Sequence, residues 1–180
     1  MIRNNRVHVC RWLSDARRRA PGEDGIDAPT SIRSSPADPP LERIALDVPS
    51  SLEGVATLEE AAEALALRAS FDEDEASSIA MATREAAINA AKHGNGFDPE
   101  KQVKAVLERI EGTVRIAIAD QGAGLDPETL PDPLDPANLL RPSGRGVFLI
   151  RAIMDEVHFR KLSPGTEITL IKHKLMEAGT

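Results

Sequence analysis

The chain has 180 residues, 41% of them hydrophobic, and a formal net charge of -7, which suits one domain with an ordinary hydrophobic core. The acidic balance argues against a nucleic-acid-binding protein, because such proteins gain affinity by neutralising phosphates with Lys and Arg. The single cysteine, Cys10, leaves no intrachain disulfide and no cysteine cluster for a metal. No apolar run is long enough for a membrane span or a signal peptide, so a cytoplasmic protein without membrane contact is expected.

Residues 1–40 are expected to form a disordered extension, basic at first and then rich in Pro, Gly and Ser. Within the first 20 residues, several arginines stand against one acid, Asp15. This composition buries too little apolar surface to offset the entropy lost on ordering. The extension is interpreted as a solvated tail or an incorrectly assigned start, with a basic arm that contacts an acidic partner as the alternative.

The ordered domain is predicted to cover residues 41–176. Residues 41–48 carry regularly placed apolar side chains that indicate a strand, and residues 51–68 show the three- and four-residue apolar spacing of an amphipathic helix. Its apolar face is expected to cover the sheet of its own domain, with a surface for a partner as the alternative. Four acids at residues 72–75 then favour the start of a second, alanine-rich helix that ends near Gly94.

The second half of the chain predicts two hairpins separated by a loop and a helix. Residues 103–110 and 113–119 indicate strands joined by a two-residue turn, and residues 158–162 and 167–172 indicate another pair. Between these hairpins lie a long Gly- and Pro-rich loop, typical of functional loops, and a helix over residues 146–155. This order predicts an α+β two-layer sandwich with a mixed, mostly antiparallel sheet and helices on one face.

A polar stripe on the second predicted helix is the first candidate for chemistry. Glu85, Asn89, Lys92 and His93 fall on one face of an α-helix and are surrounded by alanines. An amide oxygen and a carboxylate one turn apart suit a site where the amide ligates Mg²⁺ and the carboxylate accepts a proton. The alternative is a stripe that only faces water.

Two glycine-rich segments are the second and third candidates. Asp120, Gly122 and Gly124 follow a predicted strand, where the glycines allow close backbone approach and the carboxylate can accept a hydrogen bond from a base amino group. Gly144 and Gly146 lead into the predicted helix, whose free N–H groups and positive dipole end suit phosphates. Neither segment has the ending of a P-loop or the placement of a dinucleotide fingerprint, so a plain turn and a plain helix start are the alternatives.

In this order, the three segments resemble the N, G1 and G2 boxes of the ATP-binding fold shared by gyrase, histidine kinases, mismatch-repair ATPases and a heat-shock chaperone. The resemblance extends over nearly all of residues 41–176 and implies a Bergerat-type fold. The small size and the absence of an attached sensor or dimerisation domain make the chain most similar to the anti-sigma factor serine/threonine kinases of sporulation and general stress control.

The resemblance implies ATP and Mg²⁺ as cofactors. It implies that Glu85 is the general base, Asn89 the Mg²⁺ ligand and Asp120 the acceptor for the adenine amino group. The other residues that it assigns to the nucleotide site are Lys92, His93, Gly122, Gly124, Arg141, Gly144, Arg145, Gly146, Val147 and Thr166.

The resemblance further implies a protein kinase that phosphorylates an anti-anti-sigma (STAS-type) partner, binds a sigma factor and forms a homodimer, with no nucleic-acid partner. A non-catalytic, nucleotide-gated regulator of a partner protein is the alternative. The stretch between Gly124 and Gly144 favours that alternative, because it contains several prolines and few basic residues. Arg141 within it and Arg145 directly after it are the candidates for the γ-phosphate. An α+β domain without a ligand is the third possibility.

Overall fold

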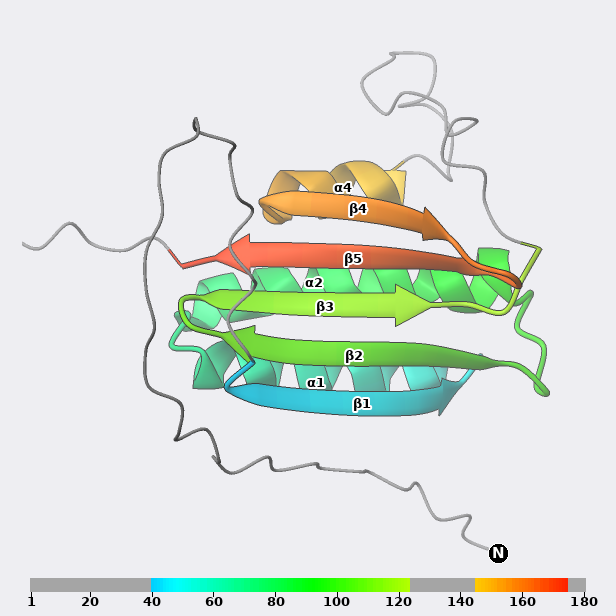
Figure 1. Ribbon diagram of the computed structural model, residues 1–180, viewed down its shortest axis with the longest axis horizontal. Coiled ribbons are helices and arrows are strands. Elements are labelled where there is room, and N and C mark those ends of the chain that lie inside the picture. The colour runs from blue at the N-terminus through cyan, green and yellow to red at the C-terminus, as the bar shows by residue number, and fades with distance from the viewer. Residues whose placement is uncertain (1–39, 124–144, 175–180) are drawn as a thin grey trace, which may run out of the picture.

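The computed structural model describes residues 40–123 and 145–174 (Figure 1). The predicted N-terminal extension and most of the predicted long loop lie outside these residues, as do residues 175–180. The described residues form a two-layer arrangement of helices and one sheet (Figure 1).

The sheet contains five strands in the order β1-β2-β3-β5-β4. These are β1 (Glu42–Pro49), β2 (Gln102–Ile110), β3 (Thr113–Ala119), β4 (Glu156–Lys161) and β5 (Thr166–His173). Each of the four neighbouring pairs is antiparallel, so the mixed, mostly antiparallel sheet that was expected is antiparallel throughout the described residues. The two predicted hairpins are confirmed as β2-β3 and β4-β5, and β5 lies between β3 and β4.

The helical layer consists of α1 (Leu52–Arg68), α2 (Glu73–Ile88), a π-helix η1 (Asn89–Gly94) that continues α2, and α4 (Arg145–Ile153). Figure 1 shows α1 and α2 on one face of the sheet, with α4 next to β4. The helix α4 packs against α2. The predicted helices are therefore present, and the layer sits on one face as expected.

The acidic run before α2 acts as a helix cap. Asp72 Oδ1 accepts a hydrogen bond from Glu75 N at 2.8 Å, and Glu75 Oε2 accepts one from Asp72 N at 3.3 Å. This capping box satisfies N–H groups that the first turn of a helix leaves without partners. At the start of α1, Ser51 Oγ accepts a hydrogen bond from Gly54 N at 3.2 Å. Local sequence thus sets where both helices begin.

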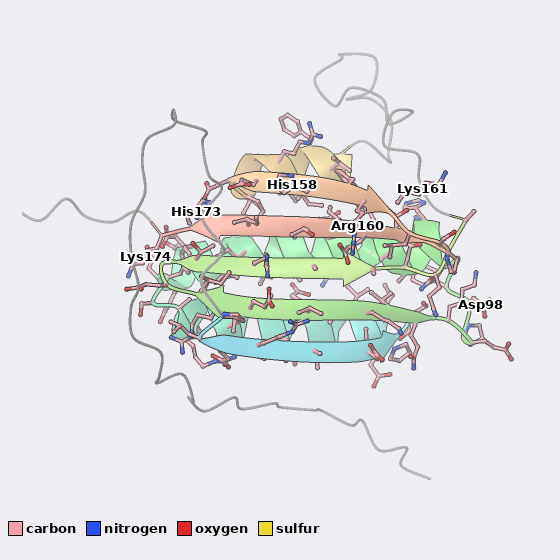
Figure 2. The ribbon with its side chains drawn as sticks, viewed as in Figure 1. Asp98, His158, Arg160, Lys161, His173 and Lys174 are labelled. Carbon is pink, nitrogen blue, oxygen red and sulfur yellow. The ribbon has the colours of Figure 1, made fainter. Side chains whose placement is uncertain are left out.

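The core lies between the helical layer and one face of the sheet. Alternate strand residues point into it, because side chains along a strand alternate between the two faces. The largest fully buried side chains include Leu58, Leu65, Ile79, Leu107, Ile116, Ile118, Ile150 and Leu170. The opposite face of the sheet is polar: Figure 2 shows His158 and Arg160 on β4 and His173 at the end of β5.

The register of this sheet brings two distant segments together at one edge of the core. Ala119 at the end of β3 pairs with Glu167 near the start of β5. The residues just beyond this pair, Asp120 and Thr166, therefore lie side by side.

Within the described part of the chain, no helix is long and apolar enough to cross a membrane.

Candidate functional site

Asp120, directly after β3, is a carboxylate held by the backbone. Its side chain is buried, with the residue 8% exposed, and Oδ1 accepts hydrogen bonds from Gly122 N at 2.8 Å and Thr166 N at 3.3 Å. Its own N–H donates to Thr166 O at 3.0 Å. Among the described residues, none donates a hydrogen bond to Oδ2. One carboxylate oxygen is thus fixed by the protein, and the other can accept a hydrogen bond from a ligand.

Three glycines allow the backbone to close around Asp120. A Cβ atom at Gly94 would lie 2.6 Å from Asp120 Oδ2, and one at Gly165 would lie 2.8 Å from the Asp120 carbonyl carbon. A Cβ atom at Gly122 would lie 2.7 Å from the Gly94 carbonyl carbon. Gly165 also has a φ of +102°, a conformation that side chains rarely adopt. The end of the N box, the G1 segment and the turn before β5 therefore meet at this carboxylate.

Gly94 and Gly165 were not among the predicted site residues. The sequence indicates Gly94 only as the end of a helix, and Gly165 lies in the short connection between the predicted strands 158–162 and 167–172. The sequence could have pointed to both glycines, because Gly94 directly follows the predicted site residue His93 and Gly165 directly precedes Thr166. Their role follows from contact with Asp120, which the sequence spacing does not reveal.

Glu85 and Asn89 meet the start of α4. A Cβ atom at Gly146 would lie 3.0 Å from Glu85 Oε2, 3.6 Å from Asn89 Nδ2 and 3.9 Å from Asn89 Oδ1. Glu85 and Asn89 are half-buried. The first turn of α4 has N–H groups without intrahelical partners and the positive end of the helix dipole. A carboxylate, an amide and a helix N-terminus of the kind that suits anions are thus adjacent.

The helix changes type at Asn89, which affects the predicted polar stripe. In η1 the hydrogen bonds widen to five-residue spacing, as in the bond from Asn95 N to Ala90 O at 2.8 Å. The α-helical spacing assumed for Lys92 and His93 was therefore wrong. Both residues are exposed, and neither side chain makes a hydrogen bond or an ion pair to the rest of the described chain. Short π-helical segments are frequent at functional sites.

Three predicted site residues lie outside the described residues: Gly124, Arg141 and Gly144. The side chain of Arg145 also lies outside them. Val147 is half-buried in the first turn of α4.

Asn95 is a buried polar residue that the sequence analysis missed. Only 3% of the residue is exposed, and its Nδ2 donates to Ser50 Oγ at 2.7 Å and to Gln102 O at 3.0 Å. Its Oδ1 accepts a hydrogen bond from Gln121 N at 2.7 Å. The sequence indicated only a turn at Gly94-Asn95-Gly96, because asparagine is common in turns.

The other end of α4 is anchored to β5. Lys172 Nζ donates to Ile153 O at 2.9 Å and contacts Asp155 Oδ1 at 3.0 Å, while His173 N donates to Asp155 Oδ2 at 2.7 Å. Partial burial raises the pKa of Asp155, but the hydrogen bond from His173 and the Lys172 ammonium outweigh it, so the pKa lies below its ordinary value. This cluster holds the helix that carries Gly146.

The oxygen atoms of Glu85 and Asn89 suit a metal ion that a bound ligand also coordinates. In the described ranges, no group of three or more His, Cys, Asp or Glu residues could hold a metal ion by itself. Glu85 and Asn89 supply oxygen atoms next to an anion-binding helix terminus. Mg²⁺ prefers oxygen ligands and is commonly bound by one or two protein groups together with phosphates. The residues present therefore fit Mg²⁺ that arrives with a nucleotide.

Comparisons with known proteins identify the family of the chain. The family model described as "Histidine kinase-like ATPase domain" matches residues 48–172. The chain is 38% identical over 112 residues to the serine-protein kinase RsbW of Staphylococcus epidermidis, covering 58% of this chain and 69% of that protein. It is 31% identical over 139 residues to the serine-protein kinase RsbW of Staphylococcus aureus, covering 72% of this chain and 86% of that protein.

A solved structure supports the fold. The crystal structure of the RsbU and RsbW domains of a Mycobacterium tuberculosis protein aligns with a TM-score of 0.50 and 18% identity, over 73% of this chain and 32% of that chain. At this identity the likeness concerns the fold alone. Together with the family match, these findings confirm the predicted resemblance and the α+β fold: the chain belongs to the histidine kinase-like ATPase domain family and is homologous to the RsbW serine-protein kinases.

Proposed function

We propose that the protein is an ATP-dependent serine/threonine protein kinase of the RsbW type. ATP binding follows from membership of an ATPase domain family. The kinase activity is supported by the relatives named serine-protein kinase RsbW. The observation that carries the proposal is the approach of Gly146, at the start of α4, to both Glu85 and Asn89. This junction joins a proton acceptor and a metal ligand to a phosphate-binding helix terminus.

The adenine end of the nucleotide is proposed to lie at Asp120. Its Oδ2 would accept a hydrogen bond from the adenine amino group while backbone N–H groups hold Oδ1. Gly122 would shape the adenine pocket by letting its backbone pack against that of Gly94 next to the carboxylate, and Thr166 lies on the other side. A buried carboxylate that is fixed before the ligand binds loses little entropy on binding.

The phosphates are proposed to lie between α2 and the start of α4. Asn89 would bind Mg²⁺ through Oδ1. Glu85 would take the proton from the substrate hydroxyl while the hydroxyl oxygen attacks the γ-phosphorus and ADP departs. Bound Mg²⁺ supplies charge neutralisation at the phosphates. The N–H groups of the first turn of α4 orient the same phosphates. The remaining predicted nucleotide contacts are Lys92, His93, Gly124, Arg141, Gly144, Arg145 and Val147.

The proposed protein substrate is an anti-anti-sigma (STAS-type) protein, and the proposed regulatory target is a sigma factor, both in the cytoplasm. The homodimer inferred from the family resemblance belongs to the same proposal. These partners accord with the acidic net charge of -7, which disfavours direct binding to nucleic acid.

The test is transfer of phosphate from radiolabelled ATP to an anti-anti-sigma protein encoded beside this chain. The Glu85→Gln variant is expected to lose at least about 100-fold in transfer rate, since general bases contribute on that order. Its ATP affinity, measured by calorimetry, should stay within about twofold of the wild type, because the amide keeps the shape of the side chain. Glu63→Gln, on the exposed side of α1, is the matched control and should behave as the wild type.

Two outcomes would contradict the proposal in different ways. Wild-type protein that binds ATP and the partner but transfers no phosphate would favour the nucleotide-gated regulator without chemistry. Transfer by Glu85→Gln at the wild-type rate would remove Glu85 as the general base while leaving the kinase activity in place.

A further inference from the structure

We propose that Asn95 is a positioning residue that sets the affinity of the site for the adenine amino group by fixing the peptide that follows Asp120. The inference rests on the proposed role of Asp120 as the acceptor for that group. It concerns a residue that lies beyond the helix carrying Glu85 and Asn89 and that the sequence motifs did not single out.

Asn95 ties together segments that are distant in the chain. Its Nδ2 donates to Ser50 Oγ, 45 residues away, and its Oδ1 accepts from Gln121 N, 26 residues away. A third bond, from Nδ2 to Gln102 O at 3.0 Å, reaches the start of β2. Ser50 and Asn95 are both 3% exposed, so the bond between them is shielded from competing water. Asn95 is therefore a junction between the β1-α1 turn, the end of η1, β2 and the G1 segment.

The junction acts directly on the peptide next to Asp120. Gln121 follows Asp120 in the chain, and its N–H is held by Asn95 at 2.7 Å while its Oε1 accepts a hydrogen bond from Gln102 N at 2.8 Å. On the other side of this peptide, Gly122 N donates to Asp120 Oδ1 at 2.8 Å. The carboxylate and the backbone that carries it are thus fixed from both directions.

Asn95 also links the two walls around the carboxylate. The preceding residue, Gly94, lies so close to Asp120 that a Cβ atom there would come within 2.6 Å of Oδ2. Asn95 therefore joins the wall formed by the end of η1 to the wall formed by the G1 segment. A shift of either wall by a few tenths of an ångström would move Oδ2 relative to a bound base.

Only a side-chain amide satisfies this junction. One atom must accept a hydrogen bond from Gln121 N while the other donates two, to Ser50 Oγ and Gln102 O. An ionised carboxylate has no donor, so Asn95→Asp would place a negative oxygen against the Gln102 carbonyl. Alanine would remove the partner of both the Gln121 N–H and the Gln102 carbonyl.

The experiment compares binding of ATP with binding of purine riboside 5′-triphosphate, which lacks the 6-amino group. Wild-type protein should prefer ATP by about tenfold or more, because the missing group would leave Asp120 Oδ2 without its hydrogen bond. Asn95→Asp and Asn95→Ala should lower this preference about three- to tenfold. Ser50→Ala should lower it about twofold, because the bond to Gln102 O still holds the amide.

Glu108→Gln is the matched control for lost stability. Glu108 is 4% exposed on the opposite face of the sheet and pairs with Arg115 and Arg43. The substitution removes the charge that holds two partly exposed arginines against this buried carboxylate, so this variant should lower the Tm and leave the preference for ATP unchanged. A change in preference is therefore a readout that a purely structural role would not produce.

The outcomes separate this inference from the proposed function. Folded Asn95 variants that retain the wild-type preference would overturn the positioning role, even if their Tm falls. If neither Asn95 variant folds, an unchanged preference in Ser50→Ala overturns it instead. Wild-type protein that binds both triphosphates equally would remove the proposed role of Asp120, and the inference with it, while ATP binding itself stands.

Discussion

The two ends of the candidate nucleotide site are built in different ways. At the proposed adenine end, Asp120 is buried, and backbone N–H groups and closely packed glycines hold it in place. At the proposed phosphate end, Glu85 and Asn89 are half-buried side chains that meet the start of another helix. The first end is thus preorganised by the backbone, whereas the second would be completed by the nucleotide and the Mg²⁺ that we propose.

This contrast gives an expectation about function. Changes at the adenine end should act mainly on affinity, because they alter contacts that are present before and during the reaction. Changes at the phosphate end should act mainly on the transfer rate, because they alter groups that work in the transition state.

The largest effect on ATP affinity is expected for Asp120→Asn. The amide would place an NH₂ group where the carboxylate accepts hydrogen bonds, so ATP binding should weaken by about one to two decades. Calorimetry measures this directly, and Asp47→Asn on exposed β1 is the matched control. An unchanged ATP affinity in the folded variant would contradict the assignment of the adenine end.

Gly146→Ala should sharpen the comparison from the phosphate end. The new Cβ would lie 3.0 Å from Glu85 Oε2, so that carboxylate must shift by a few tenths of an ångström. Phosphate transfer should fall about three- to tenfold, because small misplacements of catalytic groups are costly. The Tm should stay or rise, since alanine is the better helix former by about 0.5–1 kcal/mol.

Because the transfer rate should fall while the Tm stays or rises, a slower Gly146→Ala variant cannot be explained by lost stability. A loss of ATP affinity as large as that of Asp120→Asn would show that the two ends do not divide affinity from rate. A transfer rate equal to that of the wild type would contradict the placement of Glu85 in the reaction.

The smallest effect is expected at Asp155, which anchors α4 from its far end. Because the folded protein lowers the pKa of Asp155, its contribution to stability is present above the pKa of the unfolded chain and is lost as the pH falls through the folded value. Asp155→Asn should cost at most about 1 kcal/mol at neutral pH, since the group is partly exposed.

Tm curves from about pH 7 to about pH 3 test this prediction. The wild-type and Asp155→Asn curves should converge on acidification, with ATP affinity unchanged at neutral pH. A constant separation of the two curves across this range would contradict the proposed cause.

Much of the fold could be predicted because its signals are local. The capping box between Asp72 and Glu75 and the turn at Glu111-Gly112 depend on residues only a few positions apart. The apolar spacing of residues 51–68 likewise identified α1. Local patterning also placed Asp120 at a strand end and Gly146 at a helix start, two of the segments that meet at the site.

The π-helix could not be predicted from that patterning. The run from Asp72 to Gly94 has the composition of one continuous α-helix, so the spacing was extended past Asn89. The wider hydrogen bonds at Ala90 and Asn95 coincide with the burial of Asn95 among segments distant in the chain. That burial is a property of the tertiary structure.

By itself, the sequence determined the helices, the two hairpins, the α+β class and the family, because periodicity, caps, turns and short motifs are encoded within a few residues. Only the tertiary structure decided that β5 lies between β3 and β4, which brings Thr166 to Asp120 across 46 residues. It also decided that Gly146 meets Glu85 and that Asn95 joins its partners. These contacts depend on how the layers pack, and packing is set by the whole core and not by any one segment.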